Sequence, residues 1–218
     1  MKTIVFLGCG HNALSMFVEI ALKQFSRDVR LTVVQNLDIV SDIPYLPEGI
    51  TASVVRYDAC VFSPESNYCI GVNLPGAKKT VFEFFREKAG IGFDNYARLI
   101  DPFSSLACSV KLGKGVVINS GVVLAPFVEL RNLVTLNRNV SIGHHTMLGN
   151  FTTVHPGANI AGHCRIGEGV TIGMGANITD SVSVGDGSVI GAGSLVTKDV
   201  PARVVVYGSP ARIIRPNS

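Results

Sequence analysis

A repeat of six residues, running without insertion from Ser104 to Asp199, constrains the fold of this chain more than any other sequence feature. The third residue of each of sixteen consecutive hexads is aliphatic, from Leu106 through Ile142 to Val196. A helical face recurs every three to four residues and a simple strand alternates every two, so neither explains this period. The repeat predicts a parallel β-helix, in which three hexads form one 18-residue coil and the aliphatic residues stack inside.

Residues 1–100 lack the repeat and have the pattern of a small α/β domain. Apolar stretches predict strands over 2–7, 29–34, 50–57, 68–72 and 98–100, and helical spacing predicts helices over 13–25 and 75–88. A strand, a glycine turn, a helix and a second strand begin a doubly wound unit. The turn Gly8–Asn12 is suited to binding an anion at the start of a helix. A plain tight turn is an equally good interpretation, because the third glycine of a dinucleotide-binding fingerprint is missing. We therefore expect two domains, 1–100 and 101–218, the second ending in a C-terminal cap.

Composition excludes several classes of protein. The formal net charge is +3 and no run of Lys or Arg occurs, so no nucleic-acid partner is expected. No apolar stretch of 18 residues is present, which predicts no membrane span. Five cysteines without CxxC spacing are typical of free thiols in a reducing compartment. We expect a cytoplasmic protein.

Four of the five histidines lie between residues 144 and 163. In an 18-residue coil His163 stacks on His145 and His155 stacks on Asn137, so we expect these imidazoles, with His144, at one corner of neighbouring coils. A neutral imidazole is suited to general base catalysis near neutral pH. Two other interpretations stay open: exposed turn residues without a role, and a zinc ion shared by His145 and His163 with a third ligand from a neighbouring subunit.

The whole chain resembles the bacterial sugar O- and N-acetyltransferases of the sialic-acid O-acetyltransferase group, which includes UDP-4-amino-sugar N-acetyltransferases. The segment that carries Asn137 and His144, with residues 156–158 and 161–162, is similar to the family's catalytic segment. The tail over 191–201 and 208–212 is similar to the common ending of hexapeptide acyltransferases. The resemblance implies a left-handed β-helix, a homotrimer, and acetyl-CoA as cosubstrate in a groove between two β-helices.

The resemblance also implies roles for individual residues. His144 matches the general base, Asn137 a polar position near the sugar, and His145 replaces the acid that usually follows the base. The positions that match coenzyme contacts are Thr153, His155, Gly162, Met174 and Ala192. The positions that match nucleotide-sugar contacts are Gly10, His11, Gln35, Asn36 and Asn73, although Gln35 and Asn36 replace an acidic pair. The spacing of the zinc ligands in trimeric hexapeptide carbonic anhydrases is not matched, so no metal site is expected.

These observations predict an acetyl-CoA-dependent enzyme that acetylates the amine of a nucleotide-linked amino sugar by direct attack, with His144 as the base. The alternatives are O-acetylation of a sugar hydroxyl, a non-catalytic β-helix that binds a sugar nucleotide, and a zinc lyase.

Overall fold

The structure is a computed structural model that describes residues 2–25, 29–36, 46–63 and 66–217. The chain divides into two compact units, Met1–Pro102 and Phe103–Ser218. No helix among the described residues is long and apolar enough to cross a membrane.

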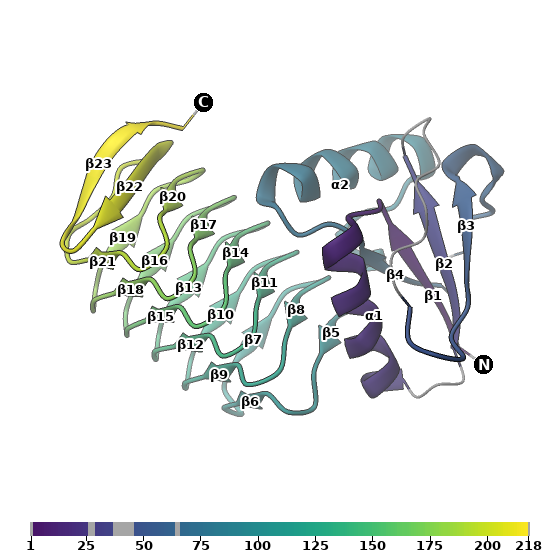
Figure 1. Cartoon of the computed structure of the whole chain (residues 1–218), viewed down its shortest axis with the longest axis horizontal. Coiled ribbons are helices and arrows are strands. Elements are labelled where there is room, and N and C mark those ends of the chain that lie inside the picture. Colours follow the sequence, from purple (N-terminus) through teal and green to yellow (C-terminus); the bar gives the residue numbers. More distant parts are fainter. Residues whose placement is uncertain (1, 26–28, 37–45, 64–65, 218) are drawn as a thin grey trace. The chain divides into compact units, whose positions relative to one another are not determined.

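The first unit is a parallel four-stranded sheet with the strand order β3-β2-β1-β4 and two helices (Figure 1). The elements, in chain order, are β1 (Lys2–Leu7), α1 (His11–Phe25), β2 (Val29–Gln35), β3 (Ala52–Arg56), η1 (Tyr57–Ala59), β4 (Asn67–Ile70), α2 (Pro75–Ala89), η2 (Phe93–Asn95) and β5 (Leu99–Ile100). The central strand β1 is buried from Ile4 to Leu7, because a parallel strand is covered on both faces. Helix α1 begins at His11, two residues before the predicted start, so the glycine turn is shorter than expected.

The second unit is a three-faced parallel β-helix made of two-residue strands (Figure 1). The first face contains β8 (Val117–Ile118), β11 (Thr135–Leu136), β14 (Thr153–Val154), β17 (Thr171–Ile172) and β20 (Val189–Ile190). The second face contains β6 (Ser105–Leu106), β9 (Val123–Leu124), β12 (Ser141–Ile142), β15 (Asn159–Ile160), β18 (Asn177–Ile178) and β21 (Leu195–Val196). The third face contains β7 (Lys111–Leu112), β10 (Glu129–Leu130), β13 (Met147–Leu148), β16 (Arg165–Ile166) and β19 (Ser183–Val184). Strand β22 (Val204–Gly208) extends the first face beyond β20 and pairs antiparallel with β23 (Ala211–Pro216), which closes the end.

The hexad pattern explains the packing of this unit. Strands pair with a shift of one coil, as where Met147 lies opposite Arg165, which confirms the predicted 18-residue period. The aliphatic third residue is buried in every hexad from Ile118 to Val196. Full burial of such a side chain contributes roughly 1.5–3 kcal/mol, so the stack of aliphatic residues stabilises the β-helix along its length. The sixth residue of the hexad takes a left-handed backbone at the turn, which suits Gly115 but is also adopted by His145 and His163.

Turns between the faces form three edges. Two of them are named after their side chains, and the third, where side chains bond from one coil to the next, is called the ladder edge. The asparagine edge joins the first face to the second and includes residues 119–122, 137–140, 155–158, 173–176 and 191–194. The histidine edge joins the second face to the third and includes residues 125–128, 143–146, 161–164 and 179–182. The ladder edge joins the third face to the first and includes residues 113–116, 131–134, 149–152, 167–170 and 185–188.

Candidate active site

Three imidazoles gather at the histidine edge. The Nδ1 atoms of His144 and His145 lie 3.2 Å apart. The rings of His145 and His163 are stacked, with centroids 5.0 Å apart and 16° between their planes, as the 18-residue period predicts. The ring of His144 stands nearly perpendicular to that of His163, at a centroid distance of 4.9 Å and an angle of 85°. All three side chains are exposed, so the cluster is open to a substrate.

Backbone hydrogen bonds between coils fix the positions of the main-chain atoms that carry these rings. The His145 N–H donates to the carbonyl of Pro126 at 3.1 Å, and the His163 N–H donates to the carbonyl of His144 at 2.9 Å. One coil below, the ring of Phe127 packs against that of His145 with centroids 4.8 Å apart. The ordered backbone therefore places exposed side chains at defined positions, which is what a preorganised site requires.

The His144 ring approaches the backbone of Gly162 closely, which was not predicted. A Cβ on Gly162 would lie 2.9 Å from Cε1 and 3.1 Å from Nε2 of His144, and 3.1 Å from Oδ1 of Asp180. The absence of a side chain at Gly162 therefore allows the His144 ring and Oδ1 of Asp180 to approach the same position beside the backbone. The signal was present in the sequence, because Gly162 and Asp180 follow His144 by one and two coils.

Asn137 and His155 lie at the asparagine edge, so the prediction of a single corner for all four histidines was wrong. The coils turn a corner every six residues, and His155 follows His144 by eleven, which places it at a different corner of the prism. The Asn137 amide is 3% exposed and donates from Nδ2 to the carbonyl of Val154 at 2.9 Å. Asn119, one coil below, donates to Leu136 in the same way at 3.0 Å. In this chain the Asn137 amide holds neighbouring coils together.

The positions expected to contact a coenzyme also divide between edges. Thr153 is buried in β14, whereas Met174 is 59% exposed and Ala192 is exposed, both at the asparagine edge with half-buried His155. Gly162 is at the histidine edge. The second face therefore lies between a group of imidazoles on one side and most of the expected coenzyme contacts on the other.

In the first unit, a pocket of about 550 Å³ lies where β1 and β4 end and the two helices begin. Gly10 and Asn73, both expected to contact a nucleotide sugar, line it together with Val72 and Leu74. The Gly10 N–H donates to the carbonyl of Gly71 at 2.9 Å, which joins the two chain segments below the pocket.

Gln35 and Asn36, two further expected nucleotide contacts, do not line this pocket. Gln35 is 4% exposed at the end of β2, and the half-buried Asn36 follows it. His11 is the first residue of α1, and its side chain lies outside the described residues. Of the four expected contacts whose placement the structure describes in full, it brings Gly10 and Asn73 together.

Cys164 is unsuited to act as a nucleophile beside the histidines. Its side chain is fully buried, and burial raises the pKa of the thiol. The Sγ atom lies 3.2 Å from the carbonyl oxygen of Thr179, to which it donates. A buried thiol with a raised pKa holds little thiolate at neutral pH, which favours direct transfer over a covalent cysteine intermediate.

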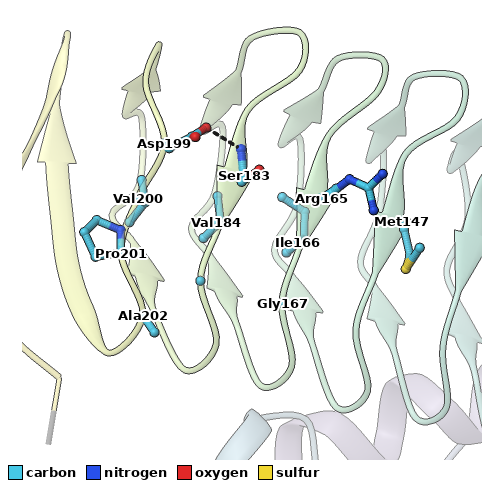
Figure 2. A pocket seen from close by; sticks show the side chains of 11 residues that line it. Met147, Arg165, Ile166, Gly167, Ser183, Val184, Asp199, Val200, Pro201 and Ala202 are labelled. Atoms are coloured by element: carbon cyan, nitrogen blue, oxygen red, sulfur yellow. Dashed lines mark hydrogen bonds between the residues drawn. The ribbon is translucent and has the colours of Figure 1, made fainter.

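A second hollow, of about 500 Å³, lies on the third face and was not predicted (Figure 2). Met147, Arg165 and Ser183 contribute side chains from successive strands, and the loop from Asp199 to Ala202 forms one end. The Ser183 N–H donates to Oδ1 of Asp199 at 2.8 Å, which fixes that loop against the coil. The hollow depends on the position of a loop after the repeat, which periodicity does not reveal.

Comparison with known proteins supports the two-part fold. Residues 145–180 and 163–198 match the family model described as bacterial transferase hexapeptide (six repeats). The acetyltransferase domain of PglB from Neisseria gonorrhoeae, solved with acetyl coenzyme A, superposes with a TM-score of 0.80 at 24% identity, over 98% of each chain. The chain shares the two-part fold of that acetyltransferase.

Two further structures support the same fold over nearly the whole chain. PerB from Caulobacter crescentus, solved with CoA and GDP-perosamine, has a TM-score of 0.74 at 20% identity, over 98% of this chain and 97% of PerB. WeeI from Acinetobacter baumannii has a TM-score of 0.79 at 21% identity, over 98% of this chain and all of WeeI, a coverage of 100%. No curated protein sequence matches the chain. The expected α/β unit followed by a parallel β-helix is confirmed.

Proposed function

We propose that this chain is an acetyl-CoA-dependent N-acetyltransferase that acts on the amine of a nucleotide-linked amino sugar. The observation that carries the proposal is the exposed His144–His145 pair, held on a rigid edge of a fold that PglB and PerB share. The PglB structure contains acetyl coenzyme A, and the PerB structure contains CoA and GDP-perosamine. Their ligands indicate the class of substrates to test.

His144 is the proposed general base. When its Nδ1 carries the hydrogen and donates to Nδ1 of His145 across 3.2 Å, its Nε2 keeps a lone pair that can accept a proton. His145 then orients the base, as an acidic residue would, although a neutral imidazole does not stabilise the imidazolium by charge. Asp180, whose Oδ1 approaches the same position beside Gly162 as the His144 ring, is the proposed acidic group of the site.

The proposed reaction is a direct acyl transfer. The uncharged sugar amine attacks the thioester carbonyl of acetyl-CoA, so a C–N bond forms and the C–S bond breaks. His144 takes a proton from the nitrogen through Nε2 and returns it to the departing thiolate of CoA. Holding both substrates in place supplies much of the rate gain, since well-oriented groups react as if highly concentrated.

The pocket at Gly10 and Asn73 is the proposed position of the nucleotide. It lies where parallel strands end and α1 begins, the usual position of ligands in open α/β sheets. Backbone N–H groups at the start of a helix favour the negative charge of phosphate groups. Of the residues expected there, Gln35 and Asn36 are proposed to act from the neighbouring strand end, and His11 from the start of α1.

A homotrimer is proposed because the two halves of the expected site lie at opposite edges of the second face. His144 and His145 occupy one edge, and Met174 and Ala192 occupy the other. A cyclic arrangement of identical chains brings one edge of each copy to the opposite edge of the next. Acetyl-CoA would then lie between two copies, with Thr153, His155, Met174 and Ala192 from one and Gly162 from the other.

The experiment that tests the function is a transfer assay with acetyl-CoA and a panel of UDP-, GDP- and dTDP-linked 4-amino sugars, each paired with its hydroxyl counterpart. Release of free CoA thiol and the mass of the product are measured. We expect acetylation of at least one amino sugar and little reaction with its hydroxyl counterpart. Transfer only to hydroxyls would make the protein an O-acetyltransferase, and failure to bind acetyl-CoA in a thermal-shift assay would make it non-catalytic.

A further inference from the structure

We propose that His144, His145 and His163 form a binding site for a divalent transition-metal ion of the zinc type, and that the bound ion inhibits acetyl transfer. The inhibition rests on the proposed function, whereas the binding does not. The three residues each offer a ring nitrogen, and these atoms all lie within 4.8 Å of one another. A zinc ion with three histidine ligands and one open position is a recurring arrangement in proteins.

The distance between the first two ligands already fits a metal ion. Two nitrogens bound to one tetrahedral zinc ion at about 2.0–2.1 Å are about 3.3 Å apart. The Nδ1 atoms of His144 and His145 are 3.2 Å apart, so one ion can bind both with little movement of either ring. Without an ion, the same two nitrogens share one hydrogen, so the metal replaces a proton between them.

His163 provides the third nitrogen from the next coil. Its ring lies 4.9 Å from that of His144 and 5.0 Å from that of His145, measured between centroids. The side chain is exposed, so it can turn about its side-chain bonds toward the ion. The sequence placed the third ligand of such a site in a neighbouring subunit, but the structure supplies all three from one chain.

Metal binding and general base catalysis exclude one another at His144. A metal bound at Nδ1 uses the lone pair of that nitrogen, and the neutral imidazole then carries its hydrogen on Nε2. Nε2 therefore has no lone pair for the proton of the sugar amine. Occupation of the site by zinc is expected to stop transfer even when both substrates are bound.

Binding is tested on the full chain, stripped with a chelator and titrated with Co²⁺, which reports tetrahedral coordination by its visible absorption, and then with Zn²⁺, which displaces it. We expect one ion per chain. The variant His163→Asn removes one ligand but keeps a residue that tolerates the left-handed backbone at this turn, where φ is 55°. It should weaken binding by at least about tenfold, because one of three ligands is lost.

The matched control is Ser181→Asn, one coil further along the same edge, where φ is 64°. It introduces the same side chain at the same kind of turn and should bind the metal like the unsubstituted protein. Absence of Co²⁺ binding in the unsubstituted protein, or equal binding by His163→Asn, would overturn the proposal.

The inhibition is measured as the transfer rate with and without Zn²⁺, each variant being compared with its own metal-free rate. The unsubstituted protein should lose activity as the site fills, and His163→Asn should need at least about tenfold more Zn²⁺ for the same loss. Full activity at a Zn²⁺ concentration that saturates the site would overturn the inhibitory role. Metal binding by a protein that transfers no acetyl group would keep the metal site and reject the proposed function.

Discussion

The ladder edge and the histidine edge are built from the same turn but use their side chains differently. At the ladder edge, Oδ1 of Asn132 accepts from the Lys114 N–H at 2.8 Å, and Oδ1 of Asn150 accepts from the Asn132 N–H at 3.0 Å. At the histidine edge the polar rings contact one another instead. Side chains that bind the next coil stabilise the β-helix, whereas side chains left exposed on the same scaffold are available for chemistry.

The largest effect is expected from His144→Ala. Removal of a general base lowers kcat by about 100- to 10,000-fold, measured as release of CoA thiol with a saturating amino sugar. Because the ring is exposed, the free energy of unfolding in urea should change by less than about 0.5 kcal/mol. A variant that keeps a near-normal rate would show that the histidine edge is not the site of proton transfer.

Gly162→Ala tests whether the position of the His144 ring at the histidine edge matters for transfer. The added methyl group would lie 2.9 Å from Cε1 of His144, so the ring has to move by a few tenths of an ångström away from residue 162. We expect kcat to fall by about tenfold, since small displacements of a catalytic group are costly. An unchanged kcat with a raised KM for acetyl-CoA would contradict this reason and assign Gly162 to the coenzyme site alone.

Asn150→Ala tests the ladder edge. The variant leaves the Asn132 N–H without its side-chain acceptor, and it also removes the bond from Nδ2 to Glu168 at 3.3 Å. The free energy of unfolding should fall by about 1–3 kcal/mol, while kcat of the folded protein stays unchanged.

The control for that change is Asn159→Ala on the second face. Its exposed side chain bonds to Asn177 and to its own turn, so its loss should cost less than about 0.5 kcal/mol. Equal destabilisation by both substitutions would show that the ladder edge has no special role in stability.

The hexad repeat was enough to predict the β-helix, its buried third positions and the stacking of His163 on His145, because one period determines all three. The prediction for His155 ignored this period. His155 follows His144 by eleven residues, which is not a whole number of 18-residue coils, so it lies at another corner. The same period also places Asp180 two coils after His144, at the same edge, although that position was not predicted. The contact between Nδ1 atoms of His144 and His145 depends on side-chain rotamers, which the sequence does not encode in any simple pattern.

The α/β unit was predicted less completely. Alternating apolar stretches predicted its strands and helices, but the pocket depends on a close approach between β1 and β4 that no single segment reveals. A side chain on Gly71 would collide with the carbonyl oxygen of Gly8, so glycine is required where these chain segments meet. The roles of Gly10 and Asn73 in binding a nucleotide remain predictions.

The most direct test of the proposed site is complementation between two inactive variants, His144→Ala at the histidine edge and Met174→Glu at the asparagine edge. Each alone should be inactive, because one lacks the base and the other places a repelling carboxylate where the coenzyme is expected. In randomly mixed trimers each site takes one edge from each of two copies, so co-expression should restore about a quarter of the activity of the unsubstituted protein. Mixed assemblies no more active than the separate variants would contradict a site shared between two copies.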